Sequence, residues 1–148
     1  MKRNGPRHRR WATLEAMAWL VLARLLIAQV PFGRWRPWLG APVAPQAGDI
    51  HLRLDANLVA RRLARAVARA AGRLPGESRC LARAMALQWM LRRRGMGGVL
   101  LIGVLPGSAR GSLDDLHAWV TRSGEVLIGA SDQPYRALFA AANPAGRS

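Results

Sequence analysis

The residues with the chemistry of a nucleophile and a base are a cysteine and a histidine in the second half of the chain. Cys80 is the single cysteine of the 148 residues, so no intramolecular disulfide can form. It falls in the first turn of a predicted helix, where free backbone N–H groups and the helix dipole stabilise a thiolate, and Arg79 adds positive charge. A lone cysteine is equally compatible with a small buried apolar residue, so position alone leaves both interpretations open.

His117 supplies the base that such a thiol requires. It alternates with its neighbours in a predicted strand, so His117 and Trp119 share one face. A hydrogen-bonded core histidine is the alternative. In thiol proteases and transglutaminases, a nucleophile at a helix N-terminus packs against a strand that carries a histidine. The imidazole takes the thiol proton and later protonates the leaving amine. The order of Cys80 and His117 along the chain fits that arrangement.

Three helices followed by three strands are expected to position this pair. Apolar residues at helical spacing predict the helices, and short apolar runs after Gly97 predict the strands. The predicted helices are 11–30, 55–74 and 79–94, and the predicted strands are 99–105, 116–121 and 125–128. Helices followed by an antiparallel meander indicate an α+β domain rather than a doubly wound parallel one.

The positive charge is concentrated in the first part of the chain. The formal net charge of +15 lies in Met1–Arg94, because the basic and acidic residues after Gly95 cancel. Five arginines fill one face of the second predicted helix: Arg61, Arg62, Arg65, Arg69 and Arg73. A solvated face explains them most simply, although such an asymmetry can also attract an acidic partner. The triplet Arg92–Arg94 ends the third helix, where cations complement the helix dipole.

Basic residues ahead of the apolar run Trp11–Val30 also match the first regions of a signal peptide. We reject that interpretation because Glu15 and Arg24 interrupt the run. They leave only 16–23 uncharged, well short of the roughly 20 residues that span a bilayer. We therefore expect a helix buried against the rest of a cytoplasmic protein, with peripheral membrane contact as the alternative.

Several segments of the chain form a recognisable set. The helix motif Cys80-Leu81-Ala82-Arg83-Ala84 ends in Leu91-Arg92-Arg93-Arg94-Gly95, and Leu101-Ile102-Gly103-Val104, His117-Ala118-Trp119-Val120 and Gly124-Glu125-Val126-Leu127-Ile128-Gly129 follow. As a set these motifs resemble the transglutaminase-like leader peptidase of lasso peptide biosynthesis, the stand-alone peptidase half of the B protein. The first apolar helix and 31–40 also resemble the leading segment of this family.

The resemblance implies a transglutaminase-like or papain-like core at 49–148, preceded by an apolar helix and a proline-rich linker at 1–48. It implies a cysteine peptidase without a cofactor, which removes the leader from a ribosomally made precursor. Cys80 would attack the carbonyl at the leader–core junction, and His117 would transfer the proton. The amides at the helix N-terminus near Cys80 would be candidate oxyanion donors.

The third residue of the family's site, an Asp, aligns with Gly129 in this sequence. Asp132 is the nearest downstream substitute, while Asp115 is poorly placed to orient the ring, and a backbone carbonyl can also serve. Similar peptidases depend on a small recognition protein that holds the leader as an added strand. The expected partners are therefore the precursor leader and this protein, with the lasso cyclase as a further candidate.

Two functions from other classes compete with the peptidase. The pI of about 12.0 and the arginine-rich helix fit a basic nucleic-acid-binding module. The helix 55–74 contains no aromatic residue to stack on bases, which argues against it, and we expect no nucleic-acid partner. A membrane-associated interaction protein without catalysis is the second alternative. A metal site is not expected, because Cys80 and the three histidines, His8, His51 and His117, have no ligand spacing.

Overall fold

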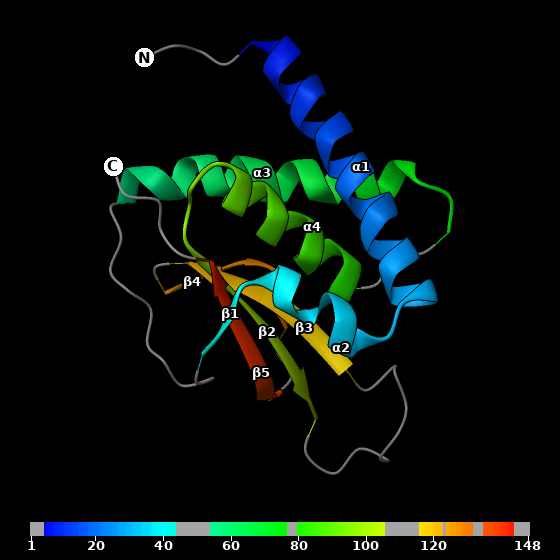
Figure 1. Cartoon of the computed structure of the whole chain (residues 1–148). Helices are drawn as coiled ribbons and strands as arrows, with labels where there is room; N and C mark the ends of the chain where they lie inside the picture. The colour runs from blue at the N-terminus through cyan, green and yellow to red at the C-terminus, as the bar shows by residue number, and fades with distance from the viewer. Residues whose placement is uncertain are drawn as a thin grey trace.

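The computed structural model describes residues 5–43, 54–76, 80–105, 116–122, 124–131 and 135–143. Its elements are α1 (Pro6–Gln29), α2 (Phe32–Trp35), the 3-10 helix η1 (Arg36–Leu39), β1 (Ala41–Pro42), α3 (Leu54–Arg73), α4 (Cys80–Arg93), β2 (Gly98–Val104), β3 (Leu116–Arg122), β4 (Glu125–Ile128) and β5 (Arg136–Asn143). The helices gather on one side of a single antiparallel sheet (Figure 1). The chain is therefore an α+β domain, as predicted. The predicted boundary at residue 48 lies outside the described residues.

In the described part of the chain, the sheet contains five strands in the order β1-β5-β2-β3-β4. The three predicted strands correspond to β2, β3 and β4, which pair as a meander. The sequence pattern did not predict two further strands: β5 returns to pair with the other edge of β2, and β1 pairs with β5. The segment Arg136–Asn143 is rich in alanine, which favours helix, but backbone pairing with β2 overrides that local preference.

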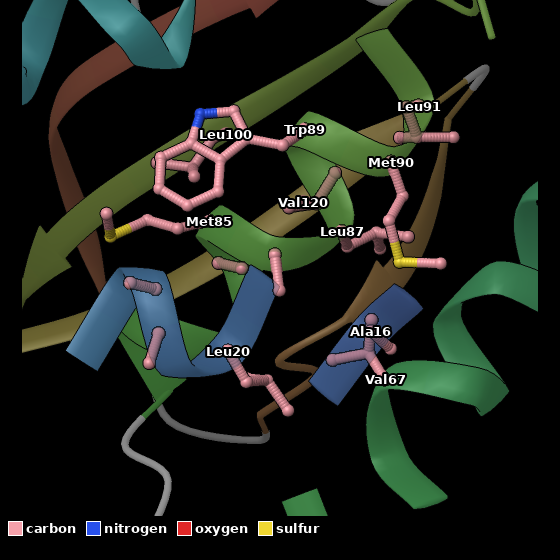
Figure 2. Close-up of a cluster of buried hydrophobic side chains, with 14 of the residues drawn as sticks. Ala16, Leu20, Val67, Met85, Leu87, Trp89, Met90, Leu91, Leu100 and Val120 are labelled. Carbon is pink, nitrogen blue, oxygen red and sulfur yellow. The ribbon is translucent and has the colours of Figure 1, made fainter. Parts of the chain in front are cut away.

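Helix α4 lies at the centre of the molecule, between the sheet and helices α1 and α3 (Figure 1). Almost every residue from Ala82 to Leu91 is buried, as expected of a helix that is apolar on all sides. Figure 2 shows side chains of α4 packed with Leu20 of α1, Val67 of α3 and Val120 of β3. Gly95 ends α4 with a positive φ of 66°, which glycine adopts without a Cβ clash. The core therefore fixes the helix that carries Cys80.

Helix α1 buries one face, with Thr13, Ala16, Leu20, Ala23 and Leu26 at helical spacing. The predicted burial is confirmed for that face only, because Trp11, Leu14, Val21 and Leu25 are exposed on the other. Over its whole length α1 is long and apolar enough to cross a membrane, although buried helices of soluble proteins and signal sequences share this property. The uncharged run alone had suggested a shorter apolar segment.

The charged residues that interrupt the apolar run of α1 make contacts between helices. Glu15 accepts bonds from Arg93 and from Arg94, whose Nη2 lies 2.7 Å from Oε2. Arg24 donates to the carbonyl oxygens of Pro75 and Gly76, just before α4. The basic triplet at the end of α4 thus has a structural role, as expected.

A buried amide joins α4 to the sheet. Nε2 of Gln88 lies within 3.3 Å of three carbonyl oxygens, those of Leu39, Gly98 and Ala141. These carbonyls belong to η1, β2 and β5, and the side chain of Asn143 donates to the carbonyl of Gln88 in turn. Buried carbonyls left without a donor would cost stability, so Gln88 fixes the height of α4 above the sheet.

Candidate active site

Cys80 is the first residue of α4 and is half-buried. The prediction placed it in the first turn of this helix, and the structure confirms that position. Its Sγ lies 3.9 Å from the carbonyl oxygen of Leu116, the residue that precedes His117. The start of α4 therefore lies beside the start of β3. Ser78 and Arg79, the predicted cap and the neighbouring cation, lie outside the described residues.

His117 is the second residue of β3 and is half-buried. Ala118 and Val120 of the same strand are buried, with Val120 beneath α4 (Figure 2). Because side chains alternate along a strand, the imidazole leaves β3 on the face opposite to Ala118 and Val120. It reaches the site at the N-terminal end of the strand. The predicted shared face of His117 and Trp119 is confirmed, since their rings stack at a centroid distance of 5.8 Å.

Tyr135 is a site residue that sequence reasoning missed. Its ring stacks on His117 with centroids 4.6 Å apart and planes 22° from parallel. It stands directly before β5, the strand that the sequence pattern did not reveal. The alternating exposure of 136–143 is visible only in the structure, because the alanine-rich sequence of this segment does not show the alternation typical of a strand. The lone signal in the sequence was the aromatic residue before this segment. The imidazole thus contacts aromatic rings from two parts of the chain, which restrict its orientation.

The carbonyl oxygen of Gly129 lies 2.5 Å from Nε2 of His117. A carbonyl oxygen can only accept, so Nε2 must carry the proton of this hydrogen bond. The neutral ring is then the tautomer whose Nδ1 lone pair is available to take a proton. The structure therefore orients the imidazole through a backbone atom at the position where the resembled family carries an Asp.

Gly129 cannot carry a side chain on this backbone. Its φ is +82°, and a Cβ built on it would collide with the carbonyl oxygen of Ala118 and press on Trp119. An aspartate at this position would require the end of β4 to move. Asp132 and Asp115, the carboxylates considered from the sequence, lie outside the described residues, so a carboxylate partner for His117 stays a prediction.

Cys80 and His117 line the same cavity, whose volume is about 740 Å³. One wall comes from the C-terminal end of α3 and Gly76, and the other from Ile128 to Ala130. Small residues, among them Gly72, Gly129 and Ala130, leave the space open. The bonds from Arg24 to Pro75 and Gly76 fix the wall that leads into Cys80.

The described contacts do not include a hydrogen bond between Cys80 and His117. The thiol faces the Leu116 carbonyl, and the imidazole is bonded to Gly129. The fold therefore brings the pair into one cavity, where each group is bonded to a different backbone carbonyl. Catalytic hydrogen bonds are often long or poorly aligned without substrate and tighten only in the complex.

Among the described residues that line this cavity, the one permanent charge is that of an arginine. Arg83, one turn beyond Cys80, lines it, and the remaining described lining residues carry no ionisable group besides the cysteine and histidine. Within the described part of the chain, no group of three or more His, Cys, Asp or Glu side chains could hold a metal ion.

Comparisons with known proteins place the chain in a family. A family model described as the Transglutaminase-like superfamily matches residues 17–140. The match runs from α1 to β5 and contains both Cys80 and His117. No curated protein and no solved structure matches the chain. This superfamily includes cysteine peptidases and transglutaminases. Because the match spans most of the chain, this protein belongs to the transglutaminase-like superfamily.

Proposed function

We propose that this protein is a cysteine peptidase that removes the leader from the ribosomally made precursor of a lasso peptide. The observation that carries the proposal is the placement of Cys80 and His117 in one cavity by different elements, within a chain of the transglutaminase-like superfamily. The motifs around both residues support the leader-peptidase specificity, because as a set they resemble that family.

In this mechanism Nδ1 of His117 takes the thiol proton as Cys80 leaves the Leu116 carbonyl. The thiolate attacks the carbonyl carbon at the leader–core junction, and the N–H groups in the first turn of α4 face the oxyanion that forms. The imidazolium then gives its proton to the leaving amine of the core peptide. A water molecule, deprotonated by His117, hydrolyses the thioester and releases the leader.

The carbonyl of Gly129 determines which nitrogen of His117 exchanges protons in each of these steps. Its carbonyl holds the Nε2 proton, so proton exchange with the thiol, the amine and the water passes through Nδ1. A neutral carbonyl orients the ring but stabilises the imidazolium less than a carboxylate would. The stacked ring of Tyr135 further restricts the orientation of the imidazole.

The proposed partners are the precursor leader and a small recognition protein that binds it, with the lasso cyclase receiving the freed core. We place this reaction in the cytoplasm. The exposed arginines of α3 are the proposed contact for an acidic surface of the leader or the recognition protein, as the charge asymmetry of the chain suggests.

The test mixes purified protein, recognition protein and precursor, and follows cleavage by mass spectrometry. Cys80→Ala and His117→Ala should each lower the cleavage rate by about 10³-fold or more, with the circular dichroism spectrum unchanged. His8→Ala, which removes an exposed imidazole from α1, should cleave at the wild-type rate. Cleavage by Cys80→Ala at the wild-type rate would disprove the peptidase mechanism.

A further inference from the structure

Arg83 is the one charged residue in the first three turns of α4, where Gln88 is the other strongly polar side chain. It lies three residues after Cys80, and residues at this spacing share a helix face with Cβ atoms about 5–6 Å apart. Arg83 is exposed and lines the same cavity as Cys80 and His117. The guanidinium is therefore positioned next to the site where Cys80 would react.

The other arginines around α4 are engaged in contacts that hold the fold together. Arg92 donates to the Trp38 carbonyl, and Arg93 and Arg94 bind Glu15. For Arg83 the described part of the chain offers neither an ion pair nor a hydrogen bond, and its neighbours in the cavity wall carry no carboxylate. Among the described residues, the Arg83 guanidinium makes no contact that holds the fold together, so it is available to a ligand in the cavity that it lines.

We infer that Arg83 binds a carboxylate of the substrate, an Asp or Glu side chain within about two residues of the cleaved bond. This inference rests on the proposed function and names its substrate class. A guanidinium matches a carboxylate through two parallel N–H···O bonds, which fixes orientation as well as charge. The Cβ atoms of Cys80 and Arg83, one helical turn apart, are separated by about 5–6 Å. Because one residue of extended peptide spans about 3.3 Å, this separation corresponds to about two substrate residues from the cleaved bond.

Binding of a substrate carboxylate by Arg83 can be distinguished from stabilisation of the Cys80 thiolate by Arg83. If Arg83 only favoured the thiolate, its removal would slow neutral and anionic reactants equally. If it binds a carboxylate, its removal slows anionic reactants selectively. The ratio of the two rates therefore separates the roles.

The first experiment measures that ratio without requiring peptidase activity. Cys80 is the only cysteine, so alkylation by iodoacetate, an anion, and by iodoacetamide, its neutral analogue, reports on this cavity alone. In Arg83→Gln the ratio of the iodoacetate rate to the iodoacetamide rate should fall about three- to tenfold below that of the wild type. At about 0.5 M salt, the two proteins should differ less in this ratio, because salt screens the charge of Arg83. Arg83→Lys keeps the charge and should keep most of the ratio.

Arg7→Gln is the matched control, because it removes the same charge from an exposed position on α1. Its ratio should equal that of the wild type. A ratio unchanged in Arg83→Gln, or lowered equally in Arg7→Gln, would overturn the inference whether or not the protein proves to be a peptidase.

The second experiment uses the precursor with its recognition protein. Changing acidic residues within two positions of the junction to their amides should raise KM about tenfold for the wild type and leave KM of Arg83→Gln unchanged. Efficient wild-type cleavage of a precursor without an acidic residue there would overturn the inference while leaving the proposed peptidase intact. Loss of all cleavage in Cys80→Ala is the separate test of the proposed function.

Discussion

At the scale of single residues, the orientation of His117 depends on a glycine. The Gly129 carbonyl accepts from Nε2, and the positive φ of this glycine aims the carbonyl at the ring. The family resemblance indicated that a glycine stands where an Asp is usual, and it left open a backbone carbonyl as the substitute. The collision that a Cβ would make with the Ala118 carbonyl explains why a side chain at position 129 cannot take this role.

We predict that Gly129→Ala lowers both activity and stability. The new methyl group forces the end of β4 away from Ala118, so the carbonyl loses its position at Nε2. Cleavage should fall about 10²-fold, because a shift of about 1 Å in a catalytic group has effects of that size. The free energy of unfolding in urea should fall by about 1–3 kcal/mol.

Gly33→Ala is the control for this change, because Gly33 lies in α2 and nothing lies within 4 Å of an added Cβ. Its free energy of unfolding should change by less than about 0.5 kcal/mol, and its cleavage rate should not change. Full activity in Gly129→Ala would show that the carbonyl does not position His117.

At the scale of elements, α4 is the central helix, which packs against α1, α3 and the sheet. Its N-terminus carries Cys80, its middle is fixed to the sheet by Gln88, and its C-terminal arginines bind Glu15 of α1. Burial alone would raise the pKa of Glu15, but its hydrogen bond with Arg94, the charges of Arg94 and Arg93 and a bond from Trp19 together hold this pKa below its usual value. The α1–α4 contact is therefore sensitive to acid.

We predict that the stabilisation from Glu15 is present above pH 4.5, the usual pKa of this group, and is lost as the pH falls through the lowered value. The sign follows because the unfolded state binds the proton more readily than the folded state. Glu15→Gln should lower the free energy of unfolding by about 1–2 kcal/mol at pH 7. Urea unfolding between pH 7 and pH 3 should show the two proteins converging as the pH falls.

Glu125→Gln, which removes the carboxylate paired with Arg61 in a more exposed position, is the comparison. It should have a smaller effect at pH 7, because solvent screens exposed ion pairs. A constant difference between wild type and Glu15→Gln over the whole pH range would contradict the assigned role of Glu15.

At the scale of the whole molecule, only some of the arginines that give the net charge of +15 make contacts within the fold. Arg61 pairs with Glu125, Arg69 donates to Thr13, and the arginines at the end of α4 bind Glu15 and Trp38. Of these residues, Arg61 and Arg69 belong to the face of α3 that the sequence analysis explained as solvated. Reversing Arg61 or Arg69 would therefore disturb the fold as well as any docking. Arg62 and Arg65 are exposed and are the better probes.

We predict that the double variant Arg62→Glu/Arg65→Glu binds the recognition protein about tenfold more weakly, because a charge at the rim of an interface acts mainly through long-range attraction. Calorimetry at two salt concentrations should show that the deficit shrinks as salt rises. Arg7→Glu/Arg10→Glu makes the same change of net charge on α1 and should bind normally. Equal affinity of wild type and the α3 variant would exclude α3 as the docking surface.

The sequence by itself determined the local features of this protein. Hydrophobic periodicity predicted α1, α3 and α4, and the short apolar runs predicted β2, β3 and β4, because these elements bury continuous or periodic apolar surface. The sequence also indicated Cys80 and His117 as a pair, from a helix N-terminus and the alternation of a strand. These inferences depend only on residues close together in the chain.

The tertiary structure decided what depends on distant segments. Strand β5 forms because its backbone pairs with the open edge of β2, although its alanines favour helix, and Tyr135 reaches His117 only through that pairing. The carbonyl of Gly129 reaches the imidazole because β4 pairs with β3 and then turns at a positive φ. Backbone groups have no sequence signature, so the sequence could leave a backbone carbonyl open as the partner of His117 but could not identify that of Gly129.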